Sequence, residues 1–209
     1  YDLIIDFNDR TYPKDLLHNL NNIANTLHEQ NKSLADIKVC TAMRNMQDKI
    51  SIKGNFVNFL RNYSNLPNHF EWTLIGVDDS SELAHTVSNF NGIYATPNTV
   101  GVDEFSKLVA KFNIFYFPDE FVDGSVGTIA AAYFLGLVII VDKHHPCWGQ
   151  LPVDDYCVQD FSELDVIINN LSLNMPDQKF LAQQRIRNYN DYALQFSNRM
   201  ADRICCLFD

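Results

Sequence analysis

The chain has 209 residues, of which 46% are hydrophobic and 20% are charged, a composition typical of a globular protein rather than a disordered one. The formal net charge is -10, which argues against a nucleic-acid polymer or an anionic membrane surface as a partner of this chain. A small phosphate-bearing ligand is still compatible with this charge, because local backbone dipoles can hold an anion.

Five cysteines, an odd number, show no C-x-x-C spacing, and Cys205 and Cys206 are adjacent. This pattern indicates reduced thiols in the cytoplasm rather than a disulfide framework or a zinc site. The longest apolar run, Val126 to Val141, is interrupted by Gly127 and Gly136 and is shorter than a membrane span. We therefore expect a cytoplasmic protein without a metal site.

Short apolar segments alternate with amphipathic segments along almost the whole chain. The predicted strands are Leu3–Phe7, Ile37–Met43, Phe70–Val77, Gly92–Ala95, Asn113–Phe117, Leu137–Val141 and Tyr156–Val158. The predicted helices are Pro13–His28, Asn55–Tyr63, Glu82–Phe90, Val102–Phe112, an alanine-rich helix after Asp123, Phe161–Leu171 and a long C-terminal tail from Met175 to Leu207.

Strands that are separated by helices need crossover connections, which predict a Rossmann-like parallel sheet with helices on both faces. Residues 1–209 show no internal linker or repeat and are expected to form a single α/β domain. Because the chain starts at Tyr1 with a strand-like segment, we interpret it as one lobe of a larger protein. Sheets of this kind bind ligands at the carboxyl ends of their strands.

The turn before the alanine-rich helix has the sequence Asp-Gly-Ser-Val-Gly-Thr, from Asp123 to Thr128. Its glycines permit a tight turn and a close approach of another group, and its hydroxyl side chains can cap the helix. The N–H groups and the positive dipole end of the helix then suit a phosphate or a sugar hydroxyl. The candidate binding residues are Gly124, Ser125, Val126, Gly127 and Thr128. The alternative is a buried crossover helix that binds no ligand.

Arg10 and Lys14 follow the predicted strand Leu3–Phe7 and are expected at the same edge of the sheet. The arginine can contact a diphosphate with two parallel hydrogen bonds, and the lysine can act as a point charge. The alternative is a solvated pair at the start of a helix, beside Asp9 and Asp15.

The segment from Phe117 to Asp142 contains "FP", "DGSVG", "AAAYFLG" and "LVIIVD" in that order. It resembles the signature segment of the retaining GT-B glycosyltransferases, in the group 1 and glycogen-synthase-like family. There, a strand ending in Pro-Ser leads through a Glu-Gly-Phe-Gly-Leu turn into a helix, which ends in a small residue and glycine before the next strand. The resemblance implies the C-terminal, nucleotide-sugar-binding lobe of a two-lobed enzyme, whose N-terminal lobe this chain lacks.

The implied reaction is transfer of a sugar from a UDP- or GDP-linked donor, with retention of configuration, in polysaccharide or glycoconjugate biosynthesis. The nucleotide-sugar is a substrate, and no cofactor is implied. The resemblance gives Asp123 a contact with the donor sugar, and it gives Arg10 and Lys14 the departing diphosphate. Thr96 and Asn98 fall where the family binds the nucleobase. Any membrane association would be peripheral and would come through the missing lobe.

Two departures from the family pattern leave an alternative function open. The second of the family's two glutamates falls on Ala131, and the family's Gly-Arg and Lys-Gly after the first strand are replaced by "FNDRTYPKD". These changes favour a catalytically silent GT-B-like subunit that binds and stabilises a partner protein. A weaker alternative is an unrelated flavodoxin-like ligand-binding or regulatory domain.

Two further motifs are compatible with chemistry but have simpler explanations. Asp78 and Asp79 could bind a metal, although a capped turn before the helix at Glu82 explains them equally well. His144, His145 and Cys147 could form a nucleophilic or metal site, but they lack further ligands nearby and are expected to lie in a loop.

Overall fold

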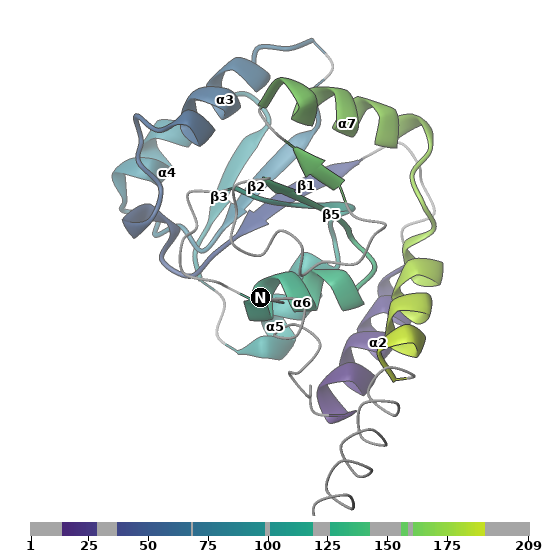
Figure 1. Ribbon diagram of the computed structural model, residues 1–209. Helices are drawn as coiled ribbons and strands as arrows, with labels where there is room; N and C mark the ends of the chain where they lie inside the picture. The colour runs from purple at the N-terminus through teal and green to yellow at the C-terminus, as the bar shows by residue number, and fades with distance from the viewer. Residues whose placement is uncertain are drawn as a thin grey trace, which may run out of the picture.

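The computed structural model describes residues 14–28, 37–67, 69–98, 101–118, 126–142, 156–158 and 161–190 (Figure 1). The strands are β1 (Lys38–Ala42), β2 (Glu71–Ile75), β3 (Ile93–Thr96), β4 (Ile114–Phe117), β5 (Val138–Asp142) and β6 (Tyr156–Val158). The helices are α2 (Lys14–His28), α3 (Asn55–Tyr63), α4 (Glu82–Val87), α5 (Val102–Val109), α6 (Val126–Phe134) and α7 (Phe161–Leu173), with a 3-10 turn η1 (Met46–Asp48). Residues 178–190 form a further helix, called the terminal helix below.

The six strands form one parallel sheet in the order β3-β2-β1-β4-β5-β6. This result confirms the predicted Rossmann-like α/β fold. β1 is the first described strand along the chain, and it lies in the middle of the sheet between β2 and β4. The earlier strand predicted at Leu3–Phe7 lies outside the described residues.

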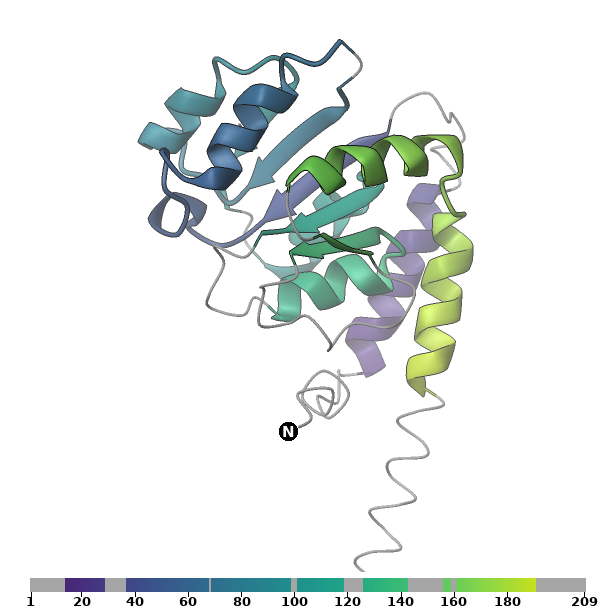
Figure 2. The ribbon, with the colours of Figure 1, turned by 45° about the horizontal axis from the view of Figure 1, so that its top comes forward.

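The helices cover both faces of the sheet (Figures 1 and 2). α3, α4 and α7 lie on one face, while α5 and α6 lie on the other. α2 contacts both α5 and α6, and the terminal helix lies beside α2. A sheet covered on both faces needs apolar residues throughout its central strands, and every residue of β4 and β5 is buried.

An aromatic cluster fixes α3 on the centre of the sheet. The ring of Trp72 on β2 makes edge-on contacts with Phe56, Phe59 and Tyr63 of α3, at centroid distances of 5.6 to 6.1 Å. Its indole N–H donates a buried hydrogen bond of 3.1 Å to Oγ1 of Thr41 on β1. Edge-on aromatic pairs add stabilisation beyond that of buried area, so this cluster orients α3 as well as covering the sheet.

The alanine-rich helix is buried, as the sequence predicts. All residues from Ile129 to Asp142 are buried, so α6 has no polar face beyond its first turn. Small side chains such as those of Ala130 and Ala132 let the helix backbone lie close to the sheet and to its neighbours. α6 therefore belongs to the core, and only its ends can meet solvent or a ligand.

The terminal helix is joined to the C-terminal end of α6 by a buried arginine. Arg185 is only 3% exposed, and its Nη1 donates to the carbonyl oxygens of Tyr133 at 3.0 Å and Leu137 at 2.7 Å. The guanidinium also lies 4.1 Å from the ring centroid of Tyr133. Gly136 has φ +80, and a side chain there would clash with the carbonyl oxygen of Gln178. The predicted C-terminal helix is thus observed as far as residue 190, where the described chain ends.

Candidate functional site

The candidate site lies at the carboxyl ends of β1 and β4, which are adjacent in the sheet. The chain leaves β1 toward α3 on one face, and it leaves β4 toward α6 on the opposite face. This divergence is the topological switch point of a parallel sheet. Open parallel sheets bind their ligands at the carboxyl ends of the strands beside such a point.

The connection after β1, residues 43–54, presents three exposed cations, Arg44, Lys49 and Lys53. Arg44 comes two residues after the end of β1, and Lys53 precedes Gly54, the N-cap of α3. These residues were missed in the sequence analysis, which looked for an Arg and a Lys-Gly pair after Leu3–Phe7. The signal was present in the sequence as Arg44 and Lys53-Gly54, but it follows a strand whose central position depends on pairing with the distant β4.

The backbone of this connection is fixed by the neighbouring strand β2. The N–H of Met43 donates to the carbonyl oxygen of Ile75 at 3.0 Å, and the N–H of Met46 donates to that of Gly76 at 2.9 Å. Met46 is fully buried, whereas Arg44 and Asn45 are exposed. The connection therefore has a rigid, anchored backbone that exposes a guanidinium group.

The turn after β2 is a capped turn. The N–H and hydroxyl of Ser80 both donate to Oδ1 of Asp78, at 3.0 and 2.9 Å, and these bonds hold the pKa of Asp78 below its ordinary value. Ser81 then caps α4 by accepting from the N–H of Ala84 at 3.1 Å. The capped-turn interpretation is thus confirmed for these residues, and no group of three or more potential metal ligands occurs in the described part of the chain.

Thr96 is the last residue of the outermost strand β3, and Asn98 follows it at the same edge of the sheet. The carbonyl oxygen of Thr96 accepts from the N–H groups of Gly76 and Val77, at 2.8 and 3.0 Å. The side-chain Nδ2 of Asn98 donates to Oδ1 of Asn45 at 2.9 Å. β3 is three strand spacings from β4, roughly 14 Å at about 4.8 Å each. Asn98 nevertheless touches the β1 connection directly.

The other predicted site residues are only partly described. Val126 and Gly127 begin α6 at the switch point, and Thr128 is half-buried in the first turn. Lys14 is the first residue of α2, and its side chain is not among the described atoms. The remaining predicted residues, Arg10, Asp123, Gly124, Ser125, His144, His145 and Cys147, lie outside the described residues.

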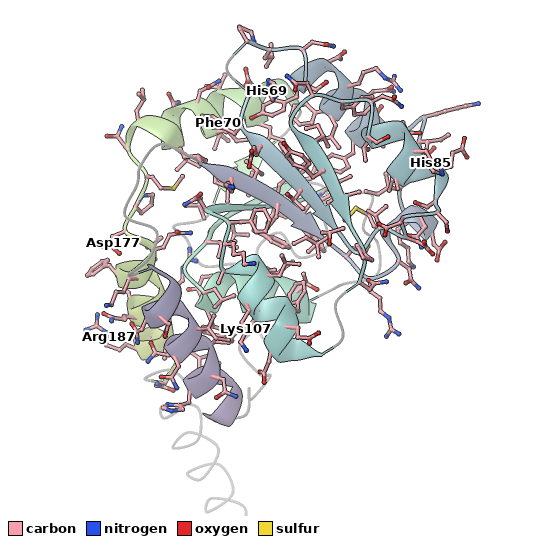
Figure 3. All side chains as sticks on the ribbon, turned by 180° about the vertical axis from the view of Figure 1, so that it is seen from behind. His69, Phe70, His85, Lys107, Asp177 and Arg187 are labelled. Carbon is pink, nitrogen blue, oxygen red and sulfur yellow. The ribbon has the colours of Figure 1, made fainter. Side chains whose placement is uncertain are left out.

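A groove of about 640 Å³ lies elsewhere, between α4 and the outer edge of β3. Its lining includes Asp79, His85, Asn91 and Tyr94. Tyr94 is 51% exposed, and Figure 3 shows His85 on α4 at the rim of the molecule. This groove is distinct from the switch point, because two strands, β2 and β1, separate β3 from β4.

The fold is similar to those of solved glycosyltransferase structures. HepE from Anabaena in complex with UDP-glucose is 14% identical, with a TM-score of 0.55, over 88% of this chain and 53% of that chain. Sucrose-phosphate synthase from Thermosynechococcus elongatus is 12% identical, with a TM-score of 0.59, over 88% of this chain and 49% of the synthase. Alpha,alpha-trehalose 6-phosphate synthase from Burkholderia multivorans is 12% identical, with a TM-score of 0.58, over 94% and 50% of the two chains.

At these identities the likeness shows the fold alone, and the chain spans about half the length of the structures it matches. No family model matches the sequence, and no curated protein is significantly similar to it. Within the described ranges, none of the helices has the length and apolar character needed to cross a membrane.

Proposed function

We propose that this chain is the nucleotide-sugar-binding half of a glycosyltransferase and that the diphosphate of the donor binds at the switch point. The observation that carries the proposal is the position of Arg44, which is exposed, follows the central strand and lies at the edge where α6 begins. A guanidinium and a helix N-terminus at the same edge of the sheet form a suitable site for a diphosphate.

The chemistry follows from the charge that develops on the leaving group. When the bond between the sugar and the diphosphate breaks, negative charge grows on the phosphate oxygens. Arg44 and the N–H groups at the start of α6 would stabilise that charge without having to reorganise during the reaction. Lys49 and Lys53 would add to the local positive potential in a chain of net charge -10. Asp123 keeps its proposed contact with the donor sugar.

In this proposal Arg44 and Lys53 take the role that the sequence analysis gave to Arg10 and Lys14. The family places its Arg and Lys-Gly after the first strand, and β1 is the first described strand of the sheet. The other half of the enzyme would supply the acceptor site and any general base.

The cysteine pattern supports a cytoplasmic location. Cys40 is fully buried, and this burial raises the pKa of its thiol.

Calorimetric titration of the chain with UDP and GDP tests the proposal. We expect saturable micromolar binding, and Arg44→Ala should weaken it about 10- to 100-fold, the loss of one charge-assisted contact. Arg10→Ala and Lys14→Ala belong in the same series, because they test the earlier assignment. Arg187→Ala is the matched control, since Arg187 is exposed on the terminal helix beside α2 (Figure 3).

A catalytically silent subunit is the second candidate, and Ala131 favours it. The family's second glutamate falls on this alanine, which is 7% exposed and lies within the apolar α6. A chain that cannot make the ribose contact can keep the fold without turning over a donor. No binding of UDP or GDP at millimolar concentration would support this candidate against the donor-binding proposal.

A further inference from the structure

Arg44 lies in a backbone segment whose two flanks are both held by the end of β2 and the turn that follows it. On its N-terminal side, the N–H of Met43 is bonded to Ile75, and the carbonyl oxygen of Met43 lies so close to Gly76 that no side chain would fit there. On its C-terminal side, Met46 is bonded to the carbonyl oxygen of Gly76. The β2 turn therefore fixes both flanks of the segment that presents the guanidinium.

Asn45, directly after Arg44, has an unusual backbone conformation. Its φ of 52 and ψ of 54 place it in the left-handed region, and it is the one non-glycine residue with positive φ among those the structure describes. Asparagine tolerates this conformation better than most residues, but its surroundings must still hold it there. The contact that holds its side chain is the 2.9 Å hydrogen bond from Asn98, which lies 53 residues further along the chain.

We infer that Asn98 is a positioning residue for Arg44. Its amide anchors Asn45 in the left-handed turn, and this turn aims the side chain of Arg44 across the switch point rather than along the surface. The loops after β1, β2 and β3 thereby act as one unit, although only the β1 connection would touch the diphosphate. The inference rests on the proposed function, because it assigns to Asn98 an effect on the affinity of that same site.

This role differs from the direct nucleobase contact that the sequence analysis gave to Asn98. A base contact would distinguish uracil from guanine and would act without Arg44. A positioning role would affect all nucleoside diphosphates equally and would disappear when Arg44 is removed. The two roles can therefore be separated by a double-mutant cycle.

The test compares the unaltered chain with Asn98→Ala, Arg44→Ala and the double variant in titrations with UDP and GDP. We expect Asn98→Ala to raise the Kd about three- to tenfold for both nucleotides, the effect of one lost hydrogen bond. In the Arg44→Ala background the same substitution should have no further effect. Asn91→Ala is the matched control, an exposed asparagine just before the opposite end of β3.

A second readout needs no ligand. Hydrogen exchange of the Met46 amide, which is bonded to Gly76, should become faster in Asn98→Ala and stay unchanged in Asn91→Ala. Additive effects of the two substitutions, or different losses for UDP and GDP, would overturn the positioning role and indicate a base contact. Unchanged affinity and unchanged exchange in Asn98→Ala would also overturn it. If Arg44→Ala binds UDP normally, or the unaltered chain does not bind it, the proposed function itself fails.

Discussion

Gly76 shows how one residue can determine the shape of the candidate site. It has φ +100, and a Cβ added there would clash with the carbonyl oxygen of Met43, so the β1 and β2 loops meet where no side chain can be placed. The sequence shows a glycine in a turn, which is common. The requirement for glycine comes from the contact between two loops that are more than thirty residues apart, and this contact is visible only in the fold.

Gly76→Ala should therefore destabilise the protein by at least about 2 kcal/mol, because it combines backbone strain with a steric clash. Gly101→Ala is the matched control, since Gly101 has φ +91 but no atom within 4 Å of an added Cβ. The control should cost only the backbone strain, about 1 kcal/mol. Urea unfolding of both variants measures the difference. Equal losses would mean that the β2 turn can move away from Met43.

Tyr63 links stability to pH at the residue scale. Its buried hydroxyl accepts a 3.0 Å hydrogen bond from the N–H of Phe70, and burial raises its pKa from about 10 to about 12. A pKa raised by folding means that the stabilisation is complete below pH 10 and is lost as the pH rises toward 12.

Tyr63→Phe should lower the free energy of unfolding by about 1 kcal/mol at pH 8, because the Phe70 amide loses its acceptor. The variant should also lose less stability than the unaltered protein when the pH is raised from 9 to 11. Urea unfolding at the three pH values provides the comparison. Parallel pH profiles for the two proteins would show that Tyr63 does not titrate with folding.

At the scale of elements, local sequence predicted most helices and strands. α3 and β6 have the predicted bounds, because their apolar spacing is unambiguous. α4 ends three residues earlier than predicted, since Ser88 and Asn89 both donate side-chain hydrogen bonds to the carbonyl oxygen of His85. Polar side chains of this kind compete with the helix for its last carbonyl groups.

The candidate site was harder to predict than the elements around it. The N-terminus of α6 could be inferred from the glycines near it in the sequence. The cations of the β1 connection could not be placed, because alternation along the chain does not reveal which strand is central. That position is set by the pairing of Cys40 with Phe115, a contact between segments 75 residues apart.

The terminal helix and α6 are coupled through Arg185, and this coupling can be tested. Arg185→Met would remove the donor to two buried carbonyl oxygens, and we expect a loss of roughly 2–4 kcal/mol in the free energy of unfolding. In Arg185→Met, amide exchange within residues 178–190 should become faster than in the unaltered protein, and this increase should be larger than any increase in the core. Arg187→Met, on the exposed side of the same helix, should leave both quantities nearly unchanged. Equal stability of the two variants would contradict the coupling of the terminal helix to α6 through Arg185.

At the scale of the whole molecule, the Rossmann-like sheet has a switch point between β1 and β4, and the proposed donor site lies there. The chain spans about half the length of the structures that it matches, so the catalytic cycle we propose needs a second half. A strongly acidic chain that binds an anion must rely on local charge. In the proposed site, the cations of the β1 connection and the dipole of α6 would supply that charge at the carboxyl edge.

The most direct test of the central claim is an NMR titration of the nitrogen-15-labelled chain with UDP. The account predicts saturable changes in amide chemical shifts that are largest in residues 43–49 of the β1 connection and in residues 126–128, the first turn of α6. It also predicts that Arg44→Ala needs about 10- to 100-fold more UDP to reach the same changes. Saturable changes centred on the groove between α4 and β3, or no change at millimolar UDP, would contradict a diphosphate site at the switch point.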